Sequence, residues 1–563
     1  MKKVLYLLLF GSVMNCKAQN YIPIPDTLSG TSIHLTMHSD SVQFLPGMKT
    51  FTNAFNQYSY LGPTLILNQG DAMTMNVDNS LTDTTTVHWH GLHVPAMADG
   101  GPHTVILSGT TWSPQFTVMN HASTFWYHPH LHMRTGEQAM RGAAGVIIVR
   151  DPEEAVLALP RTYGVDDFPL IVQSQQFDSL NQIMWRGMQD SILLVNGTTQ
   201  PQLDVPAQVV RFRLLNAAQS RNFNFGFTAN QSFYVIGNDG GLLSAPVPVT
   251  RIRLAPGERA EILVDLSTQV GQTLYLMSYA SELGTGVQGG IPPASMASDW
   301  YSPLNGADFN ILQLNVIVPT ANPVLTVPSA LVNVVPWTAG QADTTRNISF
   351  TAQSMMNLDG PFYFNGLSYD MNRIDYEIPL NRTEIWTLSN QTMVAHPFHI
   401  HDVQFFILDR SSLPPAPQEA GFKDVVLVSP FESVRFITKF EDFADPMMPY
   451  MYHCHILMHE DDGMMGQFVV VPSTNVESVS GSAYMNAYPN PLVNGSISIP
   501  VNKAFTTNPT FILSNITGQE VMHGSLVGEN GEYKISMSDL PAGTFVLKMI
   551  AGNQSSVSKI VKQ

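Results

Sequence analysis

The chain has 563 residues, a formal net charge of −17 and only 13% charged side chains. The length predicts several domains, and the negative charge argues against nucleic acid as a partner. Only two cysteines are present, Cys16 and Cys454. If the N-terminal segment that holds Cys16 is removed on export, an internal disulfide is excluded.

The first 19 residues have the features of a secretory signal peptide. The basic pair Lys2-Lys3 precedes an apolar run from Val4 to Met14 and a zone of small residues that ends near Gln19. A lipoprotein cysteine at Cys16 is the alternative, although the residues before it match that signal poorly. Since no other apolar run is long enough to span a bilayer, we expect a soluble, exported mature chain with no transmembrane segment.

Residues 20–155 are expected to form a first domain, because short β-type runs alternate there with turn residues. Thr64–Leu67, Met73–Val77 and Ala144–Val149 are examples. No helical period is sustained, so this segment predicts a sandwich or a barrel.

Residues 165–318 form a second predicted β domain, with strands expected at Val209–Leu215, Phe233–Ile236 and Arg259–Val264. This domain contains neither histidine nor cysteine. We therefore expect no transition metal in this domain, and we interpret it as a spacer that fixes the geometry of its neighbours.

A third β domain is predicted over residues 340–472, after a linker rich in proline and valine. Residues 473–483 are rich in serine, glycine and asparagine, which is typical of a flexible linker. Residues 484–563 then have the pattern of a small, separate β module.

Four histidine motifs lie in the first and third predicted domains, and each contains a His-x-His pair. The pairs are His88/His90, His128/His130, His399/His401 and His453/His455. In an extended strand both rings of such a pair face the same side. A single pair is more often an accident of the surface or the core, but four pairs in one chain predict a metal centre.

Cys454 lies between two of these histidines, so its side chain is expected on the opposite face of the strand from both rings. One strand could then serve two metal sites. His459 and Met464 follow Cys454 closely enough to join it, and thiolate, imidazole and a weak axial thioether form the ligand set of blue copper. A structural zinc site would contain more cysteine, which favours copper over zinc.

The four motifs resemble those of the multicopper oxidases, most of all the bacterial laccase and cuprous oxidase branch. Further matching segments are Leu61-Gly62-Pro63-Thr64, Asp99-Gly100-Gly101-Pro102, Asp239-Gly240-Gly241, Pro256-Gly257-Glu258-Arg259 and Gly366-Leu367-Ser368-Tyr369-Asp370-Met371-Asn372. The resemblance covers about Tyr21 to Pro472. It implies an all-β fold of three cupredoxin-like Greek-key β-sandwich domains.

The resemblance also implies four copper ions per chain and a place for each ligand. The type 1 copper would bind His396, Cys454, His459 and Met464, and the type 2 copper His88 and His399. One type 3 copper would bind His90, His128 and His455, and the other His130, His401 and His453. The type 1 site would take single electrons from a small reducing substrate, and the trinuclear cluster would reduce O2 to water.

Two acidic residues match positions that deliver protons in this branch of the family, Asp99 and Glu460. With Cys454, which would carry electrons, they are the candidate catalytic residues. The alternatives are a turn aspartate before two glycines for Asp99 and a structural carboxylate beside a ligand for Glu460.

The substrate is less well defined by the sequence. The chain has 28 methionines, several of them crowded near the fourth motif, and thioethers suit Cu(I). Methionine also fills irregular cores, however, and the long methionine-rich insertion of the best-known cuprous oxidases is not visible. Thr392 stands where that branch often has an acid. A phenol or aromatic amine is therefore as good a candidate as Cu(I).

Two other classes of protein remain as alternatives. A copper-binding or scaffold cupredoxin protein without oxidase turnover is one, although such proteins lose ligands and all twelve positions are filled here. A two-domain copper nitrite reductase is the other, but it lacks the His-Cys-His bridge.

Residues 484–563 resemble the C-terminal sorting domain of the type IX secretion system. The matching segments are Tyr488-Pro489-Asn490-Pro491, Leu540-Pro541-Ala542-Gly543-Thr544 and Lys559-Ile560-Val561-Lys562. The resemblance implies contact with the secretion machinery and a secreted or cell-surface location, after transit through the periplasm. An ordinary adhesion-like β domain is the alternative.

Overall fold

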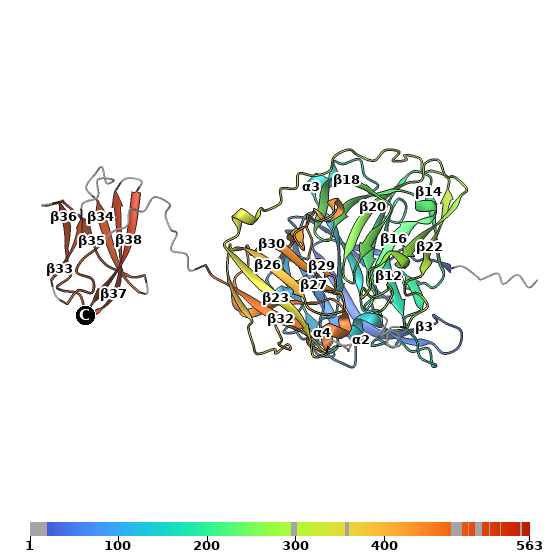
Figure 1. The fold of residues 1–563 in the computed structure, drawn as a ribbon, viewed down its shortest axis with the longest axis horizontal. Helices are drawn as coiled ribbons and strands as arrows, with labels where there is room; N and C mark the ends of the chain where they lie inside the picture. Colours follow the sequence, from blue (N-terminus) through green and yellow to red (C-terminus); the bar gives the residue numbers. More distant parts are fainter. Residues whose placement is uncertain are drawn as a thin grey trace, which may run out of the picture. The chain divides into compact units, whose positions relative to one another are not determined.

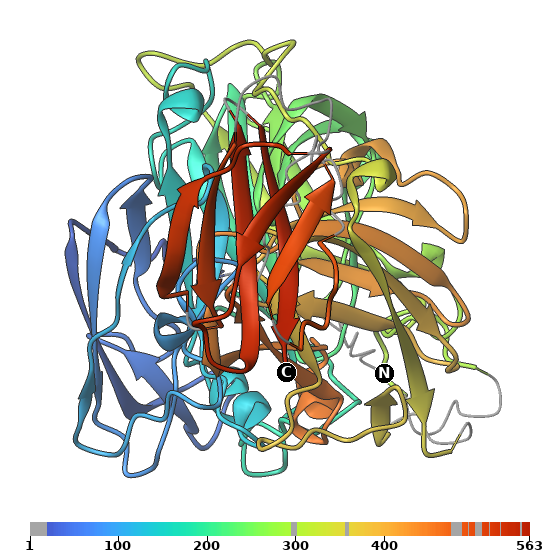
Figure 2. The same ribbon diagram turned by 90° about the vertical axis from the view of Figure 1, so that its left-hand side faces the viewer.

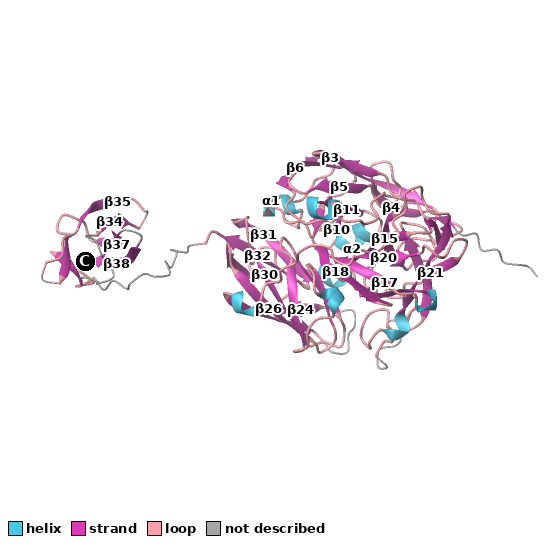
Figure 3. Ribbon diagram, turned by 90° about the horizontal axis from the view of Figure 1, so that it is seen from above, coloured by secondary structure: helices cyan, strands magenta, loops and turns pink. Residues whose placement is uncertain are grey.

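The computed structural model describes residues 20–293, 301–354, 360–473 and 487–563, apart from positions 494, 501–508, 517, 530 and 552–553. The predicted signal peptide and residues 474–483 of the predicted linker lie outside the described residues. Strands dominate the fold and the helices are short (Figure 1, Figure 3). In the part of the chain that the structure describes, no helix is both long and apolar enough to cross a membrane.

The chain divides into two compact units, residues 1–473 and 474–563. Within the first unit, residues 27–150 form a sandwich of two sheets. The first sheet has the order β2 (Thr27–Ser29), β5 (Thr64–Asn68), β11 (Gly145–Arg150), β10 (Ser123–His128) and β7 (His88–His90). The second has the order β4 (Thr50–Phe55), β3 (Ser32–Val42), β6 (Ala72–Asn79) and β8 (Thr111–Trp112), with β9 (Gln115–Thr117) on β6.

The core of this first sandwich follows from the period of its strands. On β3, Leu35 and Met37 are fully buried, and they meet Leu65 and Phe125 from the facing sheet. The same part of the chain contains three short helices: α1 (Ala96–Asp99), α2 (Thr135–Met140) and α3 (Pro152–Ala155).

The second sandwich joins two six-stranded sheets around the largest described core. One sheet has the order β13 (Ile192–Val195), β12 (Asp167–Gln175), β15 (Val209–Asn216), β20 (Arg259–Asp265), β17 (Phe233–Asn238) and β18 (Gly241–Val249). The other has the order β1 (Asn20–Tyr21), β14 (Pro201–Pro206), β22 (Asp308–Ile317), β21 (Thr273–Tyr279), β16 (Phe223–Phe227) and β19 (Ile252–Leu254). Asn20–Tyr21 fall within the predicted first domain, but they extend a sheet of the second sandwich.

The third sandwich contains two five-stranded sheets. The first has the order β24 (Phe362–Phe364), β23 (Thr344–Ala352), β26 (Thr383–Asn390), β30 (Ser433–Lys439) and β28 (Phe405–Arg410). The second has the order β25 (Tyr376–Pro379), β32 (Met465–Val471), β31 (Asp445–Cys454), β27 (His396–Ile400) and β29 (Val425–Val428). Helix α4 (Leu457–Asp461) follows β31, and the core surrounds the fully buried Trp386.

Pairing between strands brings the histidine motifs together two by two. In the first sandwich β7 pairs with β10, so that His88 lies opposite His128. In the third sandwich β27 pairs with β31, so that His399 lies opposite His453. The motifs therefore stand at the ends of two pairs of adjacent strands, one pair in each sandwich.

The second unit is a small β module with its own apolar core (Figure 2, red strands). One sheet pairs β33 (Ser496–Pro500) with β36 (Glu532–Ser536), and the other has the order β35 (Glu520–Ser525), β34 (Thr510–Asn515), β37 (Gly543–Ala551) and β38 (Gln554–Lys562). The Lys562 ammonium is buried and donates to the carbonyls of Met537 and Ser538, at 2.7 and 3.1 Å. The prediction of an all-β fold with a separate β module is confirmed.

Candidate metal centre

The first group of candidate ligands consists of His396, Cys454 and His459, all fully buried. Cys454 ends β31, His396 begins the neighbouring β27, and His459 lies on α4. The Cys454 sulfur is 3.6 Å from Nδ1 of His396 and 3.7 Å from Nδ1 of His459. Met464 is buried in the same apolar cluster, and its carbonyl accepts a hydrogen bond from the Cys454 amide at 3.0 Å. The backbone thus keeps all four side chains in one place.

The surroundings of this group keep it dry and orient its rings. Phe362 packs against His396 and His459, with ring centroids 4.6 and 4.5 Å apart. The Thr392 hydroxyl lies 3.0 Å from Nε2 of His396, which leaves Nδ1 of that ring for the side of the sulfur. Thr392 therefore fixes the orientation of the His396 imidazole, as an acid at the same position could also do.

Eight imidazoles form three further groups, and all eight are buried. The groups are His88/His399/His401, His90/His128/His455 and His130/His401/His453. In each group one nitrogen of every ring lies within 4.8 Å of the others. The second and third groups have the same members that the resemblance implies for the two type 3 ions, and His401 joins His88 and His399 in the first.

Strand β31 separates the two kinds of site. Cys454 points into the apolar core with His396, whereas His453 and the next histidine, His455, reach rings of the first sandwich. Nε2 of His453 is 3.2 Å from Nε2 of His130. The alternation of side chains along an extended strand is the physical cause of this division.

Hydrogen bonds set the tautomers of the buried rings. Nδ1 of His88 donates to the Asp99 carbonyl at 2.9 Å, and Nδ1 of His399 donates to the Asp424 carbonyl at 2.8 Å. Nδ1 of His401 donates to the Asp99 carboxylate at 2.8 Å. Nε2 of each of these three rings is buried and has no hydrogen-bond partner among the described residues. Three lone pairs are therefore directed at one small space, which is the arrangement that a metal ion would satisfy.

Asp99 and Glu460, the two predicted acids, each contact two ligand rings from outside the centre. Asp99 ends helix α1, and its Oδ1 lies 3.3 Å from Nδ1 of His88 in addition to the bond with His401. Glu460 lies on α4, 3.3 Å from Nδ1 of His130 and 3.1 Å from Nδ1 of His453. Both carboxylates are almost fully buried. Burial raises the pKa of Asp99, but the neighbouring His401 and His88 outweigh this effect and hold the pKa well below its usual value.

A third carboxylate, Asp424, was missed by the sequence analysis. Its Oδ1 accepts from Nε2 of His90 at 3.2 Å, and both oxygens accept from the Arg259 guanidinium at 2.6 Å. His90 therefore has Nδ1 facing the other imidazoles, whereas His88 and His399 have Nε2 facing them. Asp424 directly precedes β29 and has no fixed spacing from any histidine motif. The only signal in the sequence was the Arg259 segment, which resembles the family without indicating a partner.

Two glycines in the segments singled out from the sequence allow the close approach of backbone to ligands. Gly100 has φ +84° and follows α1, and a Cβ there would lie 1.8 Å from the carbonyl oxygen of Val87. Gly257 also has φ +84°, and a Cβ there would lie 2.8 Å from the His455 ring. Any side chain at either position would displace a ligand strand or a ligand ring.

Burial prepares these groups for a metal in two opposite ways. It lowers the pKa of the buried imidazoles, and neighbouring imidazoles lower it further, so that the rings are neutral and can act as ligands. This holds for His90, His128, His130, His396, His399, His455 and, at a pKa of about 3, His401. Burial raises the pKa of the Cys454 thiol, which therefore needs a bound cation to become a thiolate.

The remaining histidines near the motifs lie outside these groups. His93 is held between Asp402, at 2.7 Å, and Asp442, at 3.1 Å. Burial lowers the pKa of His93, but the two carboxylates outweigh burial and raise it to about 9. His103 lies 2.8 Å from the Gln467 amide oxygen. These residues join the sandwiches without contributing a nitrogen to the centre.

Comparison with known proteins decides the family. Three models of multicopper oxidase domains match residues 36–154, 166–294 and 338–474, one for each sandwich. The chain belongs to the multicopper oxidase family. A model of the secretion system C-terminal sorting domain matches residues 486–563, so this multicopper oxidase carries a sorting domain after its third sandwich.

Relatives cover nearly all of the first unit of this multicopper oxidase. "Multicopper oxidase mco" of Staphylococcus aureus is 32% identical over 457 residues, 80% of this chain and 90% of the relative. The cell division protein FtsP of Escherichia coli is 31% identical over 462 residues, 81% and 93% of the two chains. Among solved structures, the laccase-like multi-copper oxidase CueO of Ochrobactrum sp. superposes with a TM-score of 0.71 at 32% identity, covering 80% of this chain and all of that one. The three sandwiches are accordingly cupredoxin-like.

The donor atoms suit copper, the metal that the family implies. One sulfur, two imidazoles and a thioether match a blue copper site, and the three groups made of imidazole nitrogens alone match a copper cluster better than a magnesium or calcium site.

Proposed function

We propose that this protein is an oxidase that couples one-electron oxidations of a small reducing substrate to the four-electron reduction of O2 to water. Copper, when bound, supplies the redox chemistry at a type 1 site and at a trinuclear cluster. The observation that supports the proposal best is the position of Cys454 between His453 and His455. A single short strand then links a site of thiolate and imidazoles to a cluster made only of imidazoles.

We assign the ligands as the sequence predicted them. The type 1 site comprises His396, Cys454, His459 and Met464, and the other eight histidines hold one type 2 and two type 3 ions. The backbone from Cys454 to either adjacent histidine crosses one peptide bond, which is the shortest covalent path between the sites. The second sandwich contributes no ligand and positions the other two.

Asp99 and Glu460 have two tasks in this proposal. Each lies within 3.3 Å of Nδ1 of two rings, although only His401 donates a hydrogen bond to one of them, Asp99, and each is a buried carboxylate that can pass a proton toward the cluster. Because they approach from different sides, Asp99 from the first sandwich and Glu460 from the third, they would serve different parts of the cluster.

For the reducing substrate we propose a phenol, an aromatic amine or Cu(I). Steady-state oxygen uptake by the copper-loaded protein, with Cu(I), Fe(II) and a phenol compared at equal concentration, separates these classes. A preference for Cu(I) would assign a role to surface methionines on the strand that ends at Cys454, such as Met447, which is 86% exposed. If none of the three donors supported oxygen uptake, the proposed oxidase function would be contradicted.

A scaffold protein without turnover is the second candidate, because the similar FtsP of Escherichia coli is named for cell division. The complete set of buried ligands argues for the oxidase. Copper that binds stoichiometrically but is never reduced by any donor would favour the scaffold.

We also propose the division of the chain given above, with a signal peptide at 1–19, sandwiches at 20–155, 165–318 and 340–472, a linker at 473–483 and a type IX sorting domain at 484–563. Asn20–Tyr21 are the exception to these bounds, because they pair with β14 of the second sandwich. The match of residues 486–563 to a secretion sorting domain supports the last part. Export would proceed through the periplasm to the cell surface or the medium.

Deletion of the residues after Pro472 should separate the two functions of the chain. The first unit has its own cores, so we expect unchanged oxygen uptake per copper, whereas the truncated protein should accumulate in the periplasm. Immunoblots of periplasm and medium, with the full chain in the same host as control, measure the distribution. Truncated protein in the medium at the level of the full chain would contradict the sorting role.

A further inference from the structure

A glycine-rich loop of the second sandwich contacts the segment that leads into His396. The loop comprises residues 283–290, four of which are glycine, and it comes after strand β21. The segment comprises residues 392–395 and ends directly before β27 of the third sandwich, whose first residue is His396. No role for this loop was predicted from the sequence.

Both backbone polar groups of Ala395 bond to this loop. The Ala395 amide donates to the Gly286 carbonyl at 2.8 Å, and the Ala395 carbonyl accepts from the Gln288 side-chain amide at 2.9 Å. Ala395 is fully buried and Gln288 is 2% exposed, so water does not replace either bond. Val287 packs in the same small apolar cluster as Ala395. The loop therefore fixes the residue that precedes a proposed type 1 ligand.

The loop is itself held firmly within its own sandwich. The Gln288 carbonyl accepts from the Asn222 backbone N–H at 2.9 Å and from Nδ2 of Asn222 at 3.1 Å. Gly286 has φ +81°, and a Cβ there would lie 2.4 Å from the Met393 carbonyl oxygen. Only a residue without a side chain allows the two backbones to approach this closely.

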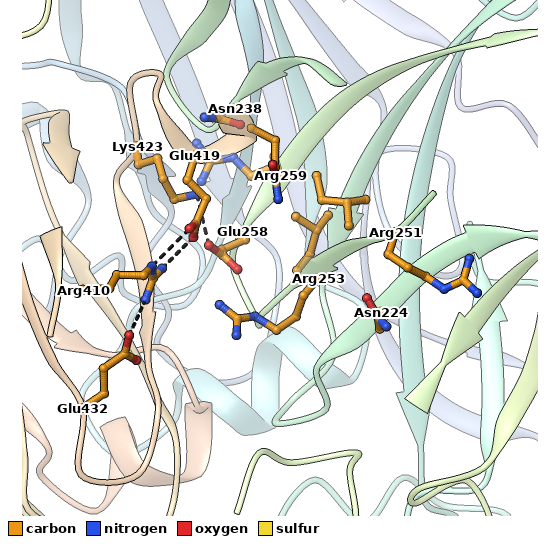
Figure 4. Close-up of a pocket in the computed structure, with 13 residues that line it drawn as sticks. Asn224, Asn238, Arg251, Arg253, Glu258, Arg259, Arg410, Glu419, Lys423 and Glu432 are labelled. Carbon is orange, nitrogen blue, oxygen red and sulfur yellow. Dashed lines mark hydrogen bonds and ion pairs between the residues drawn. The ribbon is translucent and has the colours of Figure 1, made fainter. Parts of the chain in front are cut away.

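Buried ion pairs join the same two sandwiches, so the loop faces a fixed partner. The Lys423 ammonium of the third sandwich lies 3.0 Å from Glu258 and 2.9 Å from Asp239, both of the second. Figure 4 shows Lys423 beside Glu258 at a cavity of about 350 Å³ between the sandwiches. Arg259 and Asp424 form another buried pair across this boundary, at 2.6 Å. Breaking such pairs is costly, which keeps the second sandwich in place against the third.

The third sandwich acts on the same segment from the other side. Nδ2 of Asn390 donates to the Val394 carbonyl at 2.7 Å, and the Thr392 hydroxyl lies 3.0 Å from Nε2 of His396. The third sandwich thus sets the direction of the His396 ring, whereas the second fixes the backbone from which the ring projects. Nδ1 of this ring is 3.6 Å from the Cys454 sulfur, and a shift of the backbone would change that distance.

We propose that Gln288 is a positioning residue of the type 1 site, through which the second sandwich sets the geometry of His396 relative to Cys454. This inference rests on the proposed function, because it takes His396 and Cys454 as ligands of one copper ion. Groups that hold the ligands of a metal from outside commonly change its affinity and its redox potential. The second sandwich would then tune the site that accepts electrons, although it contributes no ligand.

Gln288→Met tests the proposal in the full copper-loaded chain. Met has a similar size but no N–H for the buried Ala395 carbonyl, so we expect residues 392–395 to shift and to carry His396 with them. The blue absorption band should shift and weaken. The type 1 site should bind copper about tenfold more weakly, the low end of the effect of groups that orient a ligand. Visible spectra and copper competition with a chelator measure the two changes.

Gln175→Met is the matched control. Gln175 is also 2% exposed, and its Nε2 also donates to a backbone carbonyl in another sandwich, that of Met140 at 3.0 Å. Because Met140 does not adjoin a proposed ligand, this variant should keep the normal blue band and copper affinity, whatever it loses in thermal stability. A purely structural role of Gln288 would lower the thermal stability of both variants and leave both spectra unchanged.

A normal blue band and normal copper affinity in Gln288→Met would overturn the proposal, and so would equal spectral changes in the two variants. If Gln288→Met does not fold, Gln288→Asn replaces it, since its amide is one methylene too short to reach the Ala395 carbonyl and the same spectral change is expected. A colourless unaltered chain would instead contradict the proposed type 1 site itself, so the two failures are distinguishable.

Discussion

Cys454→Ser is expected to abolish both the blue colour and the oxidase activity, and to do so without unfolding the protein. A serine oxygen is a hard, protonated donor that cannot replace a thiolate. The type 1 site should therefore lose its copper or bind it without the thiolate that gives the blue colour. The imidazole cluster on the other face of β31 keeps all its ligands. Copper analysis should therefore show one ion fewer per chain, and oxygen uptake should fall to the level of the copper-free protein.

Met458→Leu is the control for this variant. Met458 is buried in the same cluster as Cys454 but is not among the proposed ligands, and Leu has a similar volume. Its colour and its turnover should match those of the unaltered chain. If Cys454→Ser stayed blue, the sulfur would not be a ligand, and the proposed link between the two sites would have no basis.

Asp99→Asn is expected to slow oxygen reduction by about 10- to 100-fold while leaving the blue colour intact. The asparagine amide keeps the size of the side chain, but it lacks the negative charge beside His401 and His88, and it cannot carry a proton. The type 1 group contains no atom that contacts Asp99, so its absorbance should not move. If proton delivery becomes limiting, the effect of D2O on turnover should also rise.

Asp442→Asn is the matched control, because Asp442 accepts from His93, a histidine outside the ligand groups. This variant should turn over at the normal rate. Equal turnover of Asp99→Asn and the unaltered chain would remove both the orienting role and the proton role of Asp99. Slow turnover with a normal D2O effect would retain the first role and contradict the second.

The fold could be predicted well from local patterns. Runs such as Val209–Leu215 and Arg259–Val264 agree with β15 and β20 to within a residue or two, because buried strands need apolar, β-branched residues at a period of two. Asn20–Tyr21 were harder to place. Two exposed residues carry no periodic signal, and their parallel pairing with β14 depends on where the chain folds back.

The ligand groups could also be predicted, because the His-x-His spacing itself places two rings on one face of a strand. Which strands become neighbours is a tertiary property, and only the family resemblance supplied it. The structure adds His401 to the group of His88 and His399, a convergence that no spacing along the chain could reveal.

The supporting carboxylate Asp424 was beyond the reach of the sequence for the same reason. A lone aspartate before a strand is common, and its role depends on partners far along the chain. Asp424 is significant because Arg259 and His90 approach it from two other sandwiches.

The most direct test of the central claim is the copper content of the purified, metal-loaded chain, measured together with its visible spectrum. The account predicts four copper ions per chain and an intense blue absorbance that disappears on reduction and returns in air. Fewer than three ions per chain, or a colourless protein at full loading, would contradict the assignment of Cys454 and the surrounding histidines to a type 1 site joined to a trinuclear cluster.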